Sequence, residues 1–327
     1  MSQYRRTAVA AALFAAALAA VPAQATPPGS NGLIVWQREG RRTAPHLWVA
    51  NPDGSGAREV FRGTRHQAEF EGTFDPTDPN VMFFSRGAAP FEPFVEDLVR
   101  GDLRTGAVTR IGFPNAADIA PTVSPDGTKL AWFAVPRAPL GENKPPPPMV
   151  IRVANVDGSG MRRLTARRGL ALDPDWSPDG TRLAFTQVRV VGDRGQNRIA
   201  IMNADGSGLR ALTPYGGPDE INPKWTPDGR NIMFERAREH GRRSAIAVVP
   251  PTGGRPRIVY DSPAWDTNPI PSPDGTRILF TSDRHDPRRN RINPSFELYT
   301  MRVDGADVTR LTHNRIADIF PDWQRLP

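Results

Sequence analysis

The sequence of 327 residues contains no cysteine and only three lysines, at positions 129, 144 and 224. Without cysteine the chain forms no disulfide and carries no thiol-linked lipid, so burial of a large core has to stabilise it. Arginine supplies almost all of the 42 basic residues and is scattered, with no basic helix and no cluster of stacking aromatics. The net charge of +7 therefore does not indicate a nucleic-acid partner, and we expect none.

Common catalytic patterns are also missing. None of the five histidines lies in an H-x-x-x-H or similar metal motif, and no serine lies in G-x-S-x-G. The repeated Asp and Ser residues of the sequence fall in turn motifs, where turn chemistry accounts for them. The sequence therefore favours a non-catalytic protein, although it does not decide the point.

Long hydrophobic runs are absent after the N-terminus. Residues 7–21 are small and apolar, follow Arg5-Arg6 and precede Ala23-Gln24-Ala25, an A-x-A cleavage site. We interpret residues 1–25 as a signal peptide, exported by the general or the twin-arginine route. Residues 26–31 form a short linker. We expect a soluble periplasmic or extracellular protein with no integral membrane segment after cleavage.

The dominant positive feature is a repeat of about 50 residues, typified by LDPDWSPDGTRLAF at residues 172–185. Each copy predicts a short strand, a tight S-P-D-G turn, a second strand, a third strand and a D-G-S-G turn into a fourth. Such a repeat is typical of a propeller blade. Further copies begin at residues 119, 221 and 267, a degenerate copy at 70 and a truncated copy at 319.

The two ends of the repeat series are complementary. The chain begins at a second strand, residues 33–37, and ends at a first strand, residues 321–323. Pairing these ends completes one blade and removes exposed sheet edges. We therefore predict an all-β, six-bladed propeller of four-stranded antiparallel blades over residues 32–327, closed by joining the N-terminal and C-terminal strands.

The block P-x-W-[ST]-P-D-G-[TR], followed by a hydrophobic strand and a D-G-S-G turn, resembles the repeats of the TolB-like propeller family, also called PD40 or WD40-like repeats. The resemblance covers about residues 32–325 and implies the six-bladed fold. That family includes non-catalytic interaction modules as well as propeller domains attached to enzymes.

Three residues before the proline or glycine of each first strand, five of six copies are acidic. Because innermost strands begin here, we expect these carboxylates to ring one mouth of the central channel. They could bind Ca²⁺ or another divalent cation, or a basic group of a partner. Alternatively, they bond backbone amides within each blade. The residues are Glu69, Asp118, Glu220, Asp266 and Asp318, with Ala171 in the sixth copy.

The loops between second and third strands are long and varied, at residues 86–96, 136–149, 189–197, 237–243 and 284–296. They lie on the face opposite the tight turns, and we expect binding to use them. The densest basic segment, residues 284–291, includes Arg284, His285 and Arg288 and is a candidate contact for an acidic partner. Phe91, Phe94 and Tyr215 are candidates for contacts to sugar.

The sequence thus predicts a monomeric, exported, non-catalytic propeller that binds a protein or peptide through its loop-rich face and channel mouth. The alternatives are a hydrolase or lyase acting with a cation at the acidic mouth, or a carbohydrate-binding module. No firm cofactor is predicted; a divalent cation is the open possibility.

Overall fold

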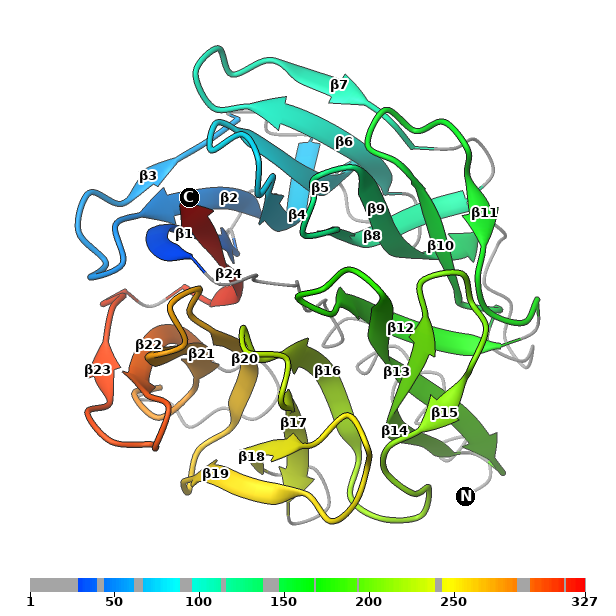
Figure 1. Cartoon of the computed structure of the whole chain (residues 1–327). Helices are drawn as coiled ribbons and strands as arrows, with labels where there is room; N and C mark the ends of the chain where they lie inside the picture. Colours follow the sequence, from blue (N-terminus) through cyan, green and yellow to red (C-terminus); the bar gives the residue numbers. More distant parts are fainter. Residues whose placement is uncertain are drawn as a thin grey trace, which may run out of the picture.

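The computed structural model describes residues 29–39, 44–61, 67–88, 96–112, 116–137, 147–167, 169–192, 194–238, 243–286, 295–314 and 316–326. The predicted signal peptide lies outside these residues. The described chain is all β and forms six four-stranded antiparallel sheets arranged in a ring (Figure 1). The predicted six-bladed propeller is confirmed.

The two inner strands of each blade carry most of the core. The innermost strands are β4 (Gln67–Phe74), β8 (Ala116–Val123), β12 (Leu170–Trp176), β16 (Glu220–Trp225), β20 (Asp266–Pro271) and β24 (Asp318–Leu326). The second strands are β1 (Ser30–Arg38), β5 (Val81–Ala88), β9 (Lys129–Pro136), β13 (Arg182–Val191), β17 (Ile232–Arg238) and β21 (Arg277–Ser282).

The third strands are comparable in length to the inner ones in several blades, whereas the fourth strands are short and mostly exposed. The third strands are β2 (His46–Ala50), β6 (Asp97–Asp102), β10 (Val150–Asn155), β14 (Arg194–Asn203), β18 (Arg243–Val249) and β22 (Glu297–Arg302). The fourth are β3 (Arg58–Glu59), β7 (Val108–Arg110), β11 (Arg162–Arg163), β15 (Arg210–Ala211), β19 (Arg257–Asp261) and β23 (Thr309–Arg310). We number the blades 1 to 6 by their second strands, from β1 to β21.

Blade 1 closes the ring in the predicted way. Its strand order is β24-β1-β2-β3, so the last strand of the chain pairs with the first. The register places Ile34 opposite Trp323 and Val35 opposite Asp322. Side chains from both strands, including Trp36 and Trp323, are buried with Ile270 and Leu279 of blade 6.

The S-P-D-G turns are built by the residues that the motif repeats. In blade 4, the backbone N–H of Gly180 donates to the Ser177 carbonyl at 2.8 Å, and Gly180 has a φ of +70°. Oδ1 of Asp179 accepts bonds from the Ser177 hydroxyl and the Thr181 N–H. These aspartates therefore fix the turn between the first and second strands.

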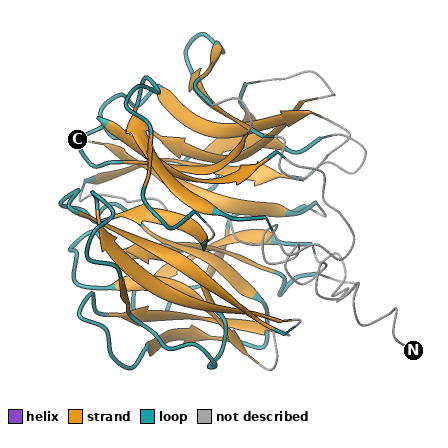
Figure 2. Ribbon diagram, turned by 90° about the vertical axis from the view of Figure 1, so that its right-hand side faces the viewer, coloured by secondary structure: helices purple, strands orange, loops and turns teal. Residues whose placement is uncertain are grey.

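The hydrophobic core lies between neighbouring blades. Trp176 of blade 4 packs with Ala131, Ile151 and Val153 of blade 3, and Trp225 of blade 5 packs with Ala184 and Ile199 of blade 4. Viewed from the side, the strands run through the thickness of the ring (Figure 2). Trp176 and Trp225 thus form part of the core between blades.

One predicted loop is wrong. Residues 189–197 were expected to be irregular, but β13 and β14 continue through them, with Val191 opposite Arg194. Val188, Val190 and Val191 are β-branched and extend the ladder, so the connection shrinks to a tight hairpin. The other irregular loops fall largely outside the described residues.

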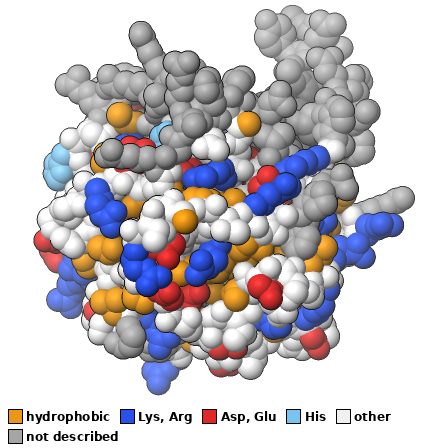
Figure 3. Space-filling model, turned by 90° about the horizontal axis from the view of Figure 1, so that it is seen from above, with side chains coloured by type: hydrophobic (Ala, Val, Ile, Leu, Met, Phe, Trp, Pro, Cys, Tyr) orange, Lys and Arg blue, Asp and Glu red, His pale blue; other side chains and the backbone are white. Residues whose placement is uncertain are grey.

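The surface of the ring mixes charges of both signs. Figure 3 shows Lys and Arg side chains distributed over one face and interspersed with Asp and Glu. In the described part of the chain, no helix is long and apolar enough to cross a membrane.

Candidate functional site

The five acidic residues predicted at the channel mouth are almost fully inaccessible to solvent. Glu69, Asp118, Asp266 and Asp318 are 0% exposed and Glu220 is 2% exposed. We call these five residues the mouth carboxylates. Burial of a charged carboxylate costs several kcal/mol unless partners compensate it, so their surroundings decide what they can do.

Two of them are held by an indole and a guanidinium. Oδ1 of Asp318 accepts the Trp36 indole N–H at 3.0 Å, and Arg38 bonds both carboxylate oxygens at 2.6 and 2.9 Å. In blade 3, Asp118 accepts the Trp132 indole N–H at 2.7 Å and lies 3.5 Å from Arg152. Both partners lie in the same blade as the carboxylate that they hold.

The other three also pair with an arginine of their own blade. Arg86 lies 2.6 Å from Glu69, Arg284 lies 2.7 Å from Asp266, and Arg236 contacts Glu220. In the first and last of these pairs the residues are direct cross-strand neighbours. The structure thus places the mouth carboxylates in five separate ion pairs and does not bring them together as one ligand group.

Blade 4 has neither the acidic residue nor the arginine of this pair. Ala171 occupies the acidic position, and its cross-strand neighbour is Gln187 rather than an arginine. Gln187 instead accepts hydrogen bonds from Arg198 at 2.7 and 3.0 Å. The acid and its arginine are therefore absent together, as expected if each exists to compensate the other.

The predicted basic contact segment is only partly described. The Arg284 guanidinium forms an ion pair with Asp266 and donates a hydrogen bond to the Tyr260 hydroxyl at 2.9 Å. It also lies 4.8 Å from the centre of the Tyr299 ring. His285 stacks on Tyr299 and its Nδ1 contacts the Tyr299 hydroxyl. Arg288, Phe91 and Phe94 lie outside the described residues, and Tyr215 is covered by Arg189 and Arg198. A role of Arg284, His285 and Arg288 in partner binding stays a prediction.

A second set of residues was not predicted. Each innermost strand carries a β-bulge, and in each bulge one residue that is not glycine has a φ between +51° and +67°. This left-handed conformation is unfavourable for side chains other than Asn and Asp. The six equivalent residues are Glu71, Ala120, Asp173, Asn222, Asn268 and Phe320.

Charged side chains of the bulges meet across the ring axis. Lys224 of blade 5 interacts electrostatically with Asp173 and Asp175 of blade 4 and with Asp322 of blade 1. Glu71 of blade 2 interacts with Asp173. Blades 1 and 5, or 2 and 4, are not neighbours, so these groups approach one another across the centre of the ring. We call Glu71, Asp173, Asp175, Lys224 and Asp322 the centre charges.

The centre charges are buried and incompletely hydrogen-bonded. Oδ2 of Asp175 accepts the Trp225 backbone N–H at 2.7 Å, which links blades 4 and 5. However, Oδ1 of Asp175, Oδ1 of Asp322 and Oε2 of Glu71 have no hydrogen-bond partner among the described residues. Buried polar atoms normally have one, so this channel can still accept donors.

Burial also changes the acidity of these groups. It raises the pKa of Asp173 and of Asp322 to about 7, in both cases against the opposing field of Lys224. Burial raises the pKa of Asp175 and of Glu71 well above the usual value. Burial lowers the pKa of Lys224 to about 8, which nearby carboxylates oppose. Among the centre charges, Asp173 and Asp322 therefore titrate near neutral pH.

A metal site is not evident in the part of the chain that the structure describes. No group of three or more His, Cys, Asp or Glu residues there is arranged to hold a metal ion. Each mouth carboxylate faces an arginine, and the centre holds an ammonium. The predicted divalent cation at Glu69, Asp118, Glu220, Asp266 and Asp318 stays a prediction.

Comparison with known proteins finds similarity to one protein family and to several curated proteins. The pattern of the family described as "TolB beta propeller domain" matches residues 33–249. The Tol-Pal system protein TolB of Bordetella pertussis is 35% identical over 158 residues, which cover 48% of this chain and 33% of that protein. The chain spans about a third of the length of the TolB relatives that it matches.

Solved structures show the same fold. TolB from Acinetobacter baumannii superimposes with a TM-score of 0.70 at 18% identity, covering 98% of this chain and 73% of that chain. An oligogalacturonate lyase in complex with manganese superimposes with a TM-score of 0.59 at 16% identity, covering 92% and 78%. At such identities the likeness shows the fold alone.

Proposed function

The chain belongs to the TolB beta propeller domain family, and on this premise we propose that it is an exported, non-catalytic propeller that binds a partner protein or peptide. Binding uses the loop-rich face and the channel. The name of the Bordetella relative places that protein in a Tol-Pal system, which supports a protein partner here. We further propose that the protein acts as a soluble monomer in the periplasm or outside the cell.

The observation that carries this proposal is the imbalance of the centre charges. Three carboxyl groups share one ammonium, and Glu71 adds a fourth carboxyl group that interacts with Asp173. Three carboxyl oxygens from three blades lack hydrogen bonds in the described part of the chain. A partner that inserts a Lys, Arg or N-terminal amine would supply the missing donors. Because the mouth carboxylates already pair with arginines, the channel centre is the better candidate for this contact.

The alternative functions stay predictions. The oligogalacturonate lyase shares only the fold, and no observation on the described residues favours a hydrolase, a lyase or a sugar-binding module. A cation-dependent function would require ligands beyond the ion pairs described above.

Affinity capture tests the proposal. Tagged mature protein is incubated with solubilised cell envelope or medium of the native organism, and captured proteins are identified by mass spectrometry. We expect the wild type to retain a defined partner and Asp175→Asn/Asp322→Asn to lose most of it, since both unsatisfied carboxylates become amides. Circular dichroism and a thermal melt establish that the variant is folded.

Asp304→Asn is the matched control, because Asp304 is an exposed carboxylate on a tight turn, 3.0 Å from Arg302. It should capture as the wild type does. Equal capture by the folded channel variant and the wild type would rule out the channel as the contact, and the single variant Asp322→Asn replaces the double one if that does not fold.

A further inference from the structure

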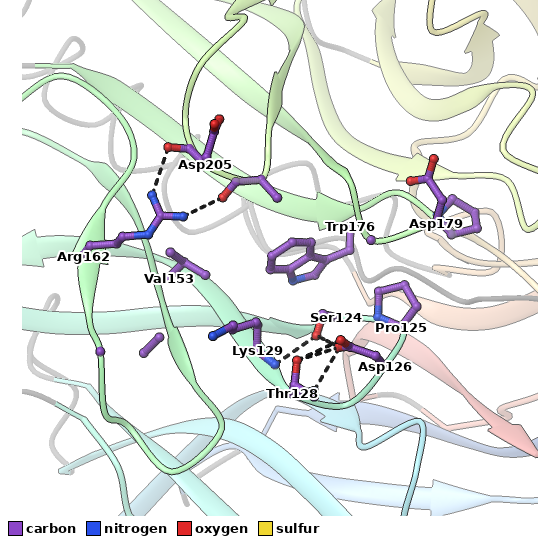
Figure 4. Close-up of a pocket in the computed structure, with 15 residues that line it drawn as sticks. Ser124, Pro125, Asp126, Thr128, Lys129, Val153, Arg162, Trp176, Asp179 and Asp205 are labelled. Carbon is purple, nitrogen blue, oxygen red and sulfur yellow. Dashed lines mark hydrogen bonds between the residues drawn. The ribbon is translucent and has the colours of Figure 1, made fainter.

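A cavity of about 460 Å³ opens between blades 3 and 4, on the side of the tight turns (Figure 4). Trp176, Val153 and Ala154 form its apolar floor, and each is at most 4% exposed. The turns after β8 and β12 contribute its rim, together with Lys129 and Arg162. This site is distinct from the channel.

The junction between blades 4 and 5 repeats the same parts. Trp225 replaces Trp176 at the equivalent position, directly before the turn motif. At the outer edge, Arg162 of blade 3 bonds the Ala204 and Asp205 carbonyls of blade 4 at 3.0 and 2.9 Å. Arg210 of blade 4 likewise bonds the Thr252 and Pro251 carbonyls of blade 5.

The two junctions differ in what covers the tryptophan. In the second, Arg182 places its guanidinium 4.7 Å from the centre of the Trp225 ring and is half-buried there. In the first, the equivalent residue is Lys129, which is exposed and bonds the side-chain oxygen of Asn155. The arginine of one junction is thus replaced at the other by a shorter side chain that turns outward.

The rim of the cavity carries carboxylates beside Lys129 and Arg162, whose cationic groups bond Asn155 and the Asp205 carbonyl. Partial burial opposes ionisation of Asp179, but bonds from Ser177 and Thr181 outweigh it and lower its pKa. Among the described residues, every hydrogen bond to this carboxylate goes to Oδ1. Asp126 is ionised by the same balance in the preceding blade. The cavity therefore has an aromatic floor and carboxylates at its rim.

We infer that this cavity receives the guanidinium of an arginine side chain from another polypeptide, which takes over Trp176 the position that Arg182 occupies over Trp225. Arginine suits this place because its planar cation stacks on an aromatic face while its N–H groups reach rim oxygens. Trp176 is only 2% exposed, so the incoming group displaces part of the rim. Lys129, exposed and held by Asn155, is the side chain best able to rotate away.

A third junction shows that an arginine at this position does not always cover the tryptophan. Arg277, the equivalent residue of blade 6, bonds Thr300 and Asp307 of its own blade. The comparison that carries the inference is therefore the one between Lys129–Trp176 and Arg182–Trp225.

Titration of the protein with small arginine derivatives tests whether the cavity beside Trp176 binds a guanidinium. The indole N–H resonance of Trp176, assigned with Trp176→Phe, is followed in the ¹⁵N-labelled mature protein as N-acetyl-arginine amide is added. We expect saturable shifts on the order of millimolar affinity for so small a ligand. N-acetyl-lysine amide should bind more weakly, and the neutral citrulline derivative should cause no saturable shift.

Two single substitutions exchange the junctions. In Lys129→Arg the new guanidinium should fill the cavity and weaken binding of the arginine derivative at least about tenfold. The melting temperature should be unchanged or raised. Arg182→Lys should expose a second site, so that the Trp225 indole resonance also responds. Asp322→Asn, at the centre of the ring, should leave both responses intact, which separates this inference from the proposed function.

Three results would overturn the inference. They are unchanged binding to folded Lys129→Arg, equal shifts with the arginine and citrulline derivatives, or a response of Trp176 to oligosaccharides but not to arginine. Absence of any saturable shift in the wild type would do the same.

Discussion

The mouth carboxylates and the centre charges are the same kind of residue in the same innermost strands, only a few positions apart. Both sets are buried. At the mouth, each carboxylate has its own arginine, as Asp318 has Arg38. At the centre, three carboxyl groups share Lys224, and the pKa of Asp173 and of Asp322 rises to about 7 through burial. Burial alone therefore does not tell whether a carboxylate is compensated; the number of nearby cations does.

Breaking a mouth pair should have the largest effect. Arg38→Ala leaves the fully buried Asp318 without its guanidinium and also removes the stacking of Arg38 on Trp48. We expect a loss of about 3–5 kcal/mol in the free energy of unfolding, measured by urea denaturation. Arg104→Ala is the control: Arg104 is 59% exposed and pairs with Asp102, so its loss should cost less than about 1 kcal/mol. Similar costs for both variants would contradict the comparison.

The pH dependence of stability should reveal the raised pKa values of the centre charges Asp173 and Asp322. Because the pKa of Asp173 and of Asp322 is about 7 in the folded protein and near 3.8 when unfolded, the folded state holds more protons between these values. Stability should therefore be highest near pH 4 and fall as the pH rises to 7. Each unit of pKa difference corresponds to about 1.4 kcal/mol, so the shifts of the two groups set an upper limit of roughly 8 kcal/mol on this fall. The free energy of unfolding is measured at intervals across this range.

Asp322→Asn removes one titrating group and should flatten this fall. Lys224 does not contribute to it, since its pKa of about 8 keeps it protonated throughout the range. Stability that rises from pH 4 to 7 in the wild type, or the same slope in the variant, would show that the centre carboxylates are compensated after all.

Installing the missing pair in blade 4 should have the smallest net effect. Ala171→Glu alone buries an uncompensated carboxylate and destabilises the protein, while Gln187→Arg supplies the cross-strand partner seen for Glu69 and Arg86. The double variant should recover part of the loss, with a coupling energy of about 1 kcal/mol in a double-mutant cycle. A coupling energy of zero would mean that the pair carries no compensation.

The sequence predicted the ring and the acidic position but not what surrounds it. Repeat counting located all six blades and the joining of β1 with β24. For the acidic position the sequence left open bonds to backbone amides, whereas arginines and indoles hold most of these carboxylates. The pairing of Glu69 with Arg86 could have been predicted from the strand register, because the two residues are direct cross-strand neighbours.

The centre charges could not be found in that way. A bulge in each innermost strand shifts the alternation of side chains, so a period of two no longer tells which residues face the axis. Asp175 and Asp322 come from opposite blades, 1 and 4, and their approach depends on the closed ring rather than on any local spacing. The cavity beside Trp176 could not be predicted for another reason. Lys129 and Arg182 occupy equivalent positions in the repeat, and only the structure shows that their side chains point in different directions.

The pairing of β24 with β1 also determines when this protein can finish folding. Trp36 and Asp318, joined by a hydrogen bond, are 282 residues apart along the chain. Contacts between such distant residues form late, because a long segment must first be ordered between them. Until residues 318–326 arrive, β1 remains an unpaired edge with Trp36 uncovered, so the nascent chain is exposed to aggregation until its last strand is made.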